Sequence, residues 1–381
     1  MMTEVALKKP KQRDSNLELF RIITMLLIVA HHYVVNSGLT AADGPIYADP
    51  LSARSLFLLL FGAWGKTGIN CFVLITGYFM CKSNITAKKF VKLLGEVIFY
   101  RILIYVIFWV SGYEPFTAVG FVKALLPFMT VAHNFTGAYL IFFLCIPFLN
   151  VLVNHMNEKQ HLRLLLLCLF TYVFFGTIPF FSVTMNYVSW YIVLYLISSY
   201  IRLYPKKLFE KTKVWGLLAG ASVLLSAASV VGCAYIGTKL GRNMAYKLVT
   251  DSNTFLAVTT GVCSFMFFKN LKLKYNPIIN AISATTFGVL LIHAHGSTMR
   301  NLLWVDILDN VGMYGSSWMP VHAIGSVLAI FAICSVIDML RIRLIEAPFL
   351  KLWDKHFLKI ASKWNAFENK LCDKLNIGSE S

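Results

Sequence analysis

Charged residues are scarce in this sequence, and their scarcity indicates the class of protein. Only 14% of the 381 residues are Asp, Glu, Lys or Arg, whereas 57% are hydrophobic, and the mean hydropathy is +0.66. In soluble domains about a quarter of the residues are charged. Because apolar runs long enough to cross a bilayer recur along the chain, we expect an all-α polytopic membrane protein rather than two soluble domains.

Several patterns typical of soluble enzymes are also missing. The chain has no phosphate-binding loop, no dinucleotide-binding glycine pattern and no G-x-S-x-G motif, which argues against intrinsic ATP-driven transport and serine-hydrolase chemistry. Its eight cysteines form no C-x-x-C pair and lie mostly in apolar runs, so we expect them to be small buried hydrophobes. Metal-ligand spacing is absent, and no metal is expected.

Acidic residues are outnumbered by basic ones, 18 to 35, which gives a formal net charge of +17. The basic residues cluster in alternate short loops, which indicates membrane topology rather than a nucleic-acid partner. With the N-terminal KKPKQR on the cytoplasmic side, both termini are expected there. The sequence predicts about ten spans, approximately at 17–36, 56–80, 90–111, 136–154, 162–181, 186–203, 214–236, 254–269, 283–300 and 320–341.

The predicted organisation has three parts. Residues 1–15 form a basic cytoplasmic N-terminus, 16–349 form the membrane domain, and 350–381 form a basic tail. The apolar run after the N-terminus contains charge and no small-residue cleavage site, so we expect a retained helix rather than a cleaved signal peptide. In the tail, aromatic residues and lysines recur at helical spacing, which is typical of an amphipathic helix on the membrane lipids. Glycines in the second span predict a break near 65–68.

The first hydrophobic helix, residues 16–36, carries four ionisable residues in an otherwise apolar segment. Charge at membrane depth is expensive and usually faces a protein interior or a wet cavity. At about 100° per residue, Glu18, Arg21 and His32 share one stripe, with His32 about 16 Å beyond Arg21 along the axis. His31 points about 80° away from Arg21. The alternative is an interfacial position for these groups, with Arg21 snorkelling to the headgroups.

An arginine and a histidine on one helix face suit acyl transfer from a phosphorylated carrier. Arg21 would bind the diphosphate of the carrier. His32 would take a proton from an attacking hydroxyl, because an imidazole titrates near neutral pH. Glu18 would pair with Arg21 and set its position.

Polar and aromatic residues in other spans are further candidates. Arg101 needs an anion, and Glu96, five residues away on the same helix, is a poor partner, so a group from elsewhere or a ligand phosphate is expected; snorkelling is the alternative. Aromatic side chains at these depths suit either a membrane belt or a stacking surface for a ring. The remaining candidates for substrate binding or support are His31, Asn70, Tyr78, Tyr139, Trp190 and His293.

These residues lie in segments that resemble the membrane-bound acyltransferase-3 family. The stretch RDSNLELFRIITMLLIVAHHY resembles the opening of that family. In the family, an acidic residue is followed three positions later by Arg, and ten residues separate this Arg from a His. Glu18, Arg21 and His32 fit this spacing, and His31 does not. NCFVLITGYFM resembles a second motif, with Thr76 in place of serine. Later segments resemble the family in the right order: TGAYLIFFLCIPFLN, SWYIVLYLISSYIR, FGVLLIH and IEAPF.

The resemblance, over roughly 13–350, implies a ten-helix O-acyltransferase of a bacterial plasma membrane. Such enzymes move acetyl or another short acyl group from cytoplasmic acyl-CoA to a hydroxyl of a cell-surface or lipid-linked carbohydrate. It implies acetyl-CoA as co-substrate, with Arg21 and Arg101 holding the donor, His32 as general base and Glu18 orienting Arg21. It leaves open whether the chain works alone or with glycan-assembly proteins, and whether transfer is direct or through an acyl-histidine.

Two other functions share the same intramembrane stripe. A transporter or flippase of an acylated or anionic glycan precursor would also need polar groups at membrane depth. The absence of an internal repeat or of paired broken segments in the sequence argues against it. A non-enzymatic scaffold of a polysaccharide assembly is the third alternative.

Overall fold

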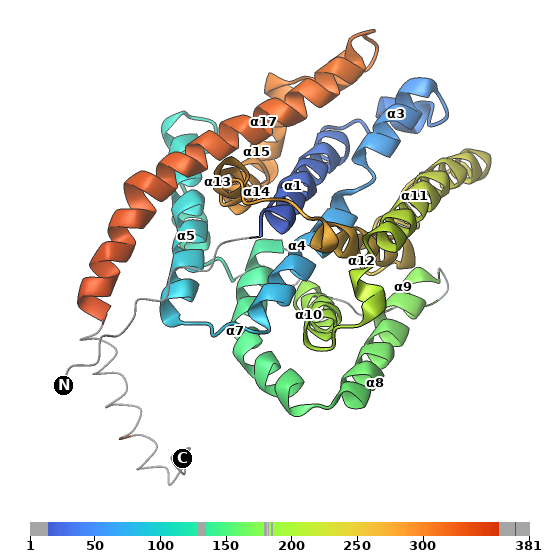
Figure 1. Ribbon diagram of the computed structural model, residues 1–381. Coiled ribbons are helices and arrows are strands. Elements are labelled where there is room, and N and C mark those ends of the chain that lie inside the picture. Colours follow the sequence, from blue (N-terminus) through green and yellow to red (C-terminus); the bar gives the residue numbers. More distant parts are fainter. Residues whose placement is uncertain are drawn as a thin grey trace, which may run out of the picture.

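The computed structural model describes residues 14–128, 135–178, 181, 183, 186–357 and 370. Within these ranges it consists of helices joined by loops, without β-strands (Figure 1). The longer helices are α1 (Ser15–Val35), α3 (Ala53–Gly62), α4 (Gly65–Met80), α5 (Ala87–Val110), α7 (Phe135–His155), α8 (Glu158–Cys168), α10 (Tyr187–Leu203), α11 (Thr212–Leu240), α12 (Phe255–Asn270) and α17 (Met319–Arg341). Shorter ones are α2 (Pro45–Ala48), α6 (Ala118–Leu125), α9 (Phe175–Thr177), α13 (Pro277–Ser283), α14 (Thr286–His293), α15 (Ser297–Asn301) and α16 (Asn310–Met313).

The prediction of an all-α polytopic membrane protein is confirmed. Among the described residues, seven helices are long and apolar enough to cross a membrane, or eight if one bent pair forms a single span. Helices α10 and α12 also coincide with predicted spans but are shorter, at 17 and 16 residues. The exact number of spans and the side on which the termini lie stay predictions.

Helix α4 lies at the centre of the bundle. It packs against α1, α10 and α12, and Figure 1 shows α8, α11 and α17 farther out. Small residues on α4 allow these close contacts, because a Cβ added to Gly68 would lie 2.9 Å from Ile28 of α1, and one added to Gly77 would lie 2.2 Å from the Ser198 hydroxyl of α10.

The predicted break in the second span lies at residues 63–64, slightly before the predicted 65–68. A break at membrane depth frees backbone carbonyls, which must find partners because lipid offers none. The Gly62 carbonyl accepts a hydrogen bond from His31 Nδ1 at 2.7 Å. Gly65 leaves room for that ring, since an added Cβ would lie 2.2 Å from His31 Cγ. His31 therefore stabilises the junction between α3 and α4.

The ninth predicted span, 283–300, is not one straight helix. Helix α14 ends at His293, and the segment from Ser297 runs at 98° to the helices before it. The intervening residues 294–296 line a cavity. Non-helical backbone is tolerated at membrane depth where it lines a cavity, so the bend is compatible with a buried site.

A buried ionic cluster joins α5 to α17. Arg341 lies between three carboxylates, with nitrogen–oxygen distances of 3.1 Å to Glu96, 2.6 Å to Asp338 and 2.8 Å to Glu346. Tyr100 also donates a hydrogen bond to Asp338, at 2.7 Å. The cation at the centre compensates carboxylates that would otherwise be very unfavourable at this depth. Glu96 of α5 thus forms its ion pair with a residue of α17 and not with a residue of α5.

Candidate functional site

Two cavities are lined by residues of α1. The first, which we name the Arg21 cavity, has a volume of about 670 Å³ and is lined by Glu18 and Arg21. The second, the His32 cavity, has a volume of about 300 Å³. Helices α1, α4, α5, α7 and α14 contribute to both, and on α4, α7 and α14 the nearest lining residues of the two cavities are about one turn apart. The predicted polar stripe therefore faces two cavities, with Glu18 and Arg21 at one and His32 at the other.

His32 is held by a chain of hydrogen bonds that ends on the backbone. His32 Nδ1 lies 2.9 Å from His293 Nε2, and His293 Nδ1 lies 2.6 Å from the carbonyl oxygen of Val289. Because a carbonyl only accepts, His293 Nδ1 carries a proton, and in a neutral ring its Nε2 is an acceptor. His32 Nδ1 then donates to it, which leaves the lone pair on His32 Nε2 for another group. The arrangement fits a general base fixed in one tautomer.

His31 faces away from both cavities, as helical phasing predicts. Its ring contacts the junction of α3 and α4 rather than the cavities. The structure accordingly gives this histidine a packing role.

Arg21 and Glu18 form an ion pair at 3.3 Å in the Arg21 cavity. Glu18 also accepts a hydrogen bond from the hydroxyl of Ser283 in α13, so the carboxylate is fixed from a second element. Tyr139 lines the same cavity, and its hydroxyl lies 3.0 Å from that of Thr76. The pairing of Glu18 with Arg21 is therefore present, and the guanidinium remains in contact with the cavity.

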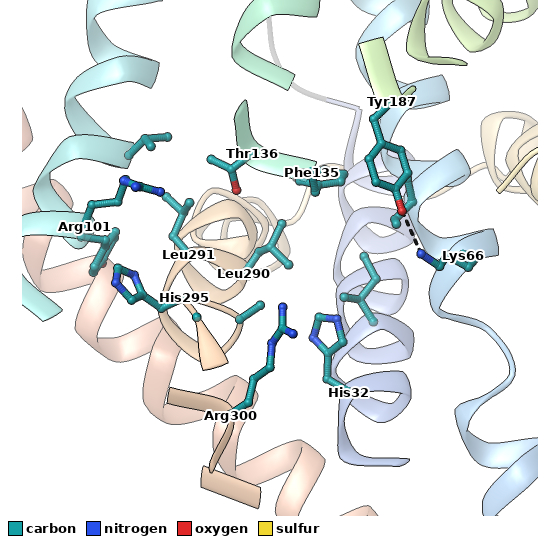
Figure 2. A pocket seen from close by; sticks show the side chains of 16 residues that line it. His32, Lys66, Arg101, Phe135, Thr136, Tyr187, Leu290, Leu291, His295 and Arg300 are labelled. Atoms are coloured by element: carbon teal, nitrogen blue, oxygen red, sulfur yellow. Dashed lines mark hydrogen bonds between the residues drawn. The ribbon is translucent and has the colours of Figure 1, made fainter. Parts of the chain in front are cut away.

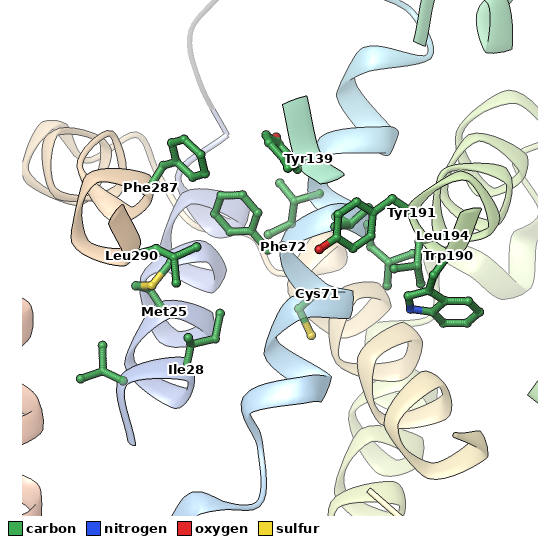
Figure 3. Close-up of a cluster of buried hydrophobic side chains, with 14 of the residues drawn as sticks. Met25, Ile28, Cys71, Phe72, Tyr139, Trp190, Tyr191, Leu194, Phe287 and Leu290 are labelled. Atoms are coloured by element: carbon green, nitrogen blue, oxygen red, sulfur yellow. The ribbon is translucent and has the colours of Figure 1, made fainter. Parts of the chain in front are cut away.

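Aromatic rings lie between the two cavities. Figure 3 shows Phe72 of α4 near Phe287 of α14 and Tyr139 of α7, with ring-centroid distances of 6.4 and 6.0 Å. Tyr139 and Phe287 are 5.6 Å apart. All three line the Arg21 cavity, and Phe135, which lines the His32 cavity, contacts Phe72 and Tyr139. We name Phe72, Tyr139 and Phe287 the aromatic septum.

The His32 cavity also contains polar residues that are not among the candidates chosen from the sequence. Figure 2 shows Lys66, Tyr187, His295 and Arg300 around it, together with Arg101. Arg101, which was predicted to help Arg21 hold the donor, lines the His32 cavity and not the Arg21 cavity. A lysine in the middle of the long second span was a usable signal, because charge at that depth needs a reason. Arg300 gave no such signal, since it follows the unforeseen bend.

Three predicted residues lie away from both cavities. Trp190 Nε1 donates to the Asn70 side chain at 2.9 Å, and Asn70 Nδ2 donates to the Ser252 carbonyl at 2.6 Å. Both side chains are fully buried, so they join α4, α10 and the segment before α12. The Tyr78 hydroxyl accepts a hydrogen bond from Arg202 at 2.7 Å, and the Arg202 guanidinium lies 4.6 Å from the centroid of the Tyr78 ring. These contacts stabilise the bundle and do not reach His32.

Comparison with known proteins gives one match. A family model described as an acyltransferase domain matches residues 14–339. The curated proteins and the solved structures that were compared contain no match to this chain. The matched range contains both cavities and every residue that lines them apart from Arg341, Ile342 and Glu346.

Proposed function

The chain belongs to the acyltransferase-3 family and is a membrane acyltransferase, and on that premise we propose that it moves an acetyl or other short acyl group from cytoplasmic acyl-CoA to a carbohydrate hydroxyl. The donor would bind at the Arg21 cavity, and the acceptor would enter the His32 cavity. The acceptor would belong to a cell-surface or lipid-linked glycan of a bacterial plasma membrane. The hydrogen-bond chain from Val289 through His293 to His32 carries this proposal, because it leaves one imidazole lone pair beside a cavity.

The reaction follows from that lone pair. The acceptor hydroxyl oxygen attacks the thioester carbonyl carbon while His32 Nε2 takes the hydroxyl proton. The tetrahedral intermediate collapses, the carbon–sulfur bond breaks, and the departing thiolate takes the proton back from His32. His293 holds the base in the correct tautomer throughout, as the third member of a catalytic triad does. No acyl-histidine is required, since His32 acts as a base.

The Arg21 cavity supplies what the donor needs. Arg21, Lys89 and Lys92 would contact the phosphates of CoA, and Glu18 would keep Arg21 in position. The thioester lies at the far end of the pantetheine arm, so it could reach past the aromatic septum while the phosphates stay behind. The phosphates would then lie in the Arg21 cavity, and the reacting carbon would lie in the His32 cavity.

The test is acetyl transfer by the purified full-length protein in proteoliposomes. Acetyl-CoA labelled in the acetyl group is supplied on one side, with cell-envelope glycan as acceptor, and label on the glycan is counted. We expect His32→Ala to lower transfer by about 10²–10⁴-fold and Arg21→Gln chiefly to raise KM for acetyl-CoA. His155→Ala is the matched control, because His155 is exposed and lines neither cavity.

Two results would refute the proposal. Normal transfer by a correctly folded His32→Ala protein would show that His32 is not the general base. Passage of unaltered glycan across the membrane, without label on any acceptor, would favour the transport alternative instead.

A further inference from the structure

The His32 cavity has an unusual balance of charge. Three cationic side chains line it, from three separate elements: Lys66 of α4, Arg101 of α5 and Arg300 of α15. None of the described residues that line it is Asp or Glu. Lys66 and Arg300 also lie near enough for their charges to act on the His32 ring. The positive charge is thus concentrated at the proposed point of reaction.

The neighbouring Arg21 cavity differs in this respect. Its described lining contains four basic and four acidic residues, namely Arg21, Lys89, Lys92 and Arg341 with Asp14, Glu18, Glu96 and Glu346. Ion pairs such as Arg21 with Glu18 and Lys92 with Glu346 connect the two sets. One cavity therefore compensates its own charge, whereas the other does not.

Among the described residues, neutral groups position Lys66 and Arg101, and no carboxylate pairs with any of the three cations. Lys66 Nζ donates to the Tyr187 hydroxyl at 2.8 Å. Arg101 donates to the carbonyls of Lys123 and Ala124 at 2.5 and 3.1 Å. For Arg300, the part of the chain that the structure describes offers no carboxylate within ion-pair distance, and its buried Nε has no hydrogen-bond partner there.

Two acidic residues of neighbouring segments are engaged elsewhere. Glu114 accepts a hydrogen bond from Thr298, and Asp306 accepts one from Tyr113. Neither carboxylate lines the His32 cavity. Uncompensated charge at membrane depth is expensive, and where it persists a functional partner is the first explanation.

We propose that the acceptor carries a negative charge, a carboxylate or a phosphate, which Lys66, Arg101 and Arg300 bind while its hydroxyl faces His32. This inference rests on the proposed function, because it names the substrate class of the same site. One cation suffices to stabilise the oxyanion of a tetrahedral intermediate, and three exceed that need. The phosphates of the donor would not explain the excess, since the proposed function places them in the Arg21 cavity, on the other side of the aromatic septum.

The test measures equilibrium binding to the full-length protein in nanodiscs. Labelled glucuronic acid supplies a sugar carboxylate, glucose 1-phosphate supplies a sugar phosphate, and glucose is the neutral reference. We expect at least one anionic sugar to bind about tenfold or more tightly than glucose, with an advantage that falls as salt rises. Comparing the two anionic sugars shows which anion the cavity prefers.

Variants connect the binding to the cavity. Lys66→Gln and Arg300→Gln should each weaken the binding of the preferred anionic sugar by about tenfold and leave glucose unchanged. Arg300→Lys keeps the charge and should retain most of the affinity. Lys239→Gln is the matched control, because Lys239 is an exposed cation that lines neither cavity.

The outcomes separate this inference from the proposed function. Equal binding of all three sugars, or wild-type binding by both Gln variants, overturns the anionic acceptor. Loss of CoA affinity in the Gln variants, with sugar binding intact, also overturns it, because the cations would then serve the donor. Cavity-dependent binding of an anionic sugar without acetyl transfer to any glycan supports the inference and counts against the proposed function. Acetyl transfer at the wild-type rate in variants that lack these cations would support the proposed function and count against the anionic acceptor.

Discussion

Replacing His293 tests the arrangement of the proposed base most directly. His293→Leu keeps a side chain of similar size but removes the acceptor that holds the His32 Nδ1 proton, at 2.9 Å in the structure. A neutral hydrogen bond of this kind contributes about 1 kcal/mol, or about fivefold in the population of the correct tautomer. The freed ring also reaches other rotamers. We therefore expect kcat to fall by roughly tenfold, less than the 10²–10⁴-fold expected for loss of the base itself.

The measurement is acetyl transfer from labelled acetyl-CoA in proteoliposomes. His293→Gln returns an acceptor near the position of Nε2 and should recover part of the lost rate. His322→Leu is the matched control, because it removes a hydrogen bond of 2.8 Å to Tyr33 of α1 without altering either cavity lining. Equal thermal unfolding temperatures of the variants would show that the comparison concerns chemistry and not folding.

A double-mutant cycle gives the strictest form of the test. If His293 acts only through His32, then adding His293→Leu to His32→Ala should cause no further loss of rate. An additive loss, or a wild-type kcat for His293→Leu alone, would refute the tautomer argument.

Three further predictions concern the surroundings of the site. Arg341→Ala removes the cation that three buried carboxylates share, and among the described residues only Glu346 keeps another ion-pair partner, Lys92. The substitution should destabilise the fold by about 3–5 kcal/mol in detergent unfolding assays; an effect no larger than that of exposed Arg343→Ala would contradict this. Gly65→Ala places a Cβ 2.2 Å from an imidazole carbon and should lower the unfolding temperature, whereas Gly95→Ala meets no atom within 4 Å and should not. Phe287→Ala removes one ring of the aromatic septum and should raise the rate with butyryl-CoA relative to acetyl-CoA. An unchanged ratio of the two rates would show that the aromatic septum does not limit the length of the acyl group.

Helical periodicity by itself placed much of the first helix correctly. Residues three or eleven apart return to the same face of any α-helix, so Glu18, Arg21 and His32 had to line one side and His31 had to leave it. The second-span glycines likewise indicated a break, because glycine tolerates close helix contacts and weakens helices. Apolar length and basic loops were enough for the polytopic class, since both depend on local composition.

Contacts between distant segments were not accessible in this way. Nothing in the sequence placed His293 against His32, 261 residues earlier in the chain, or separated Arg101 from Arg21. Asn70 and Trp190 were candidates for substrate binding or support, and only the structure showed that they hydrogen-bond to each other in the core. A polar residue at membrane depth must find a partner, but whether that partner is protein or ligand depends on which helices become neighbours.

The sequence alone determined a helical membrane protein with an acid, an arginine and a histidine along one helix face, because composition and periodicity act over short distances. The tertiary structure decided the rest. It divided that face between two cavities, oriented His32 through His293, and gathered three cations from three helices around the His32 cavity. Each of these depends on helix packing and on backbone carbonyls that only the folded bundle brings into reach.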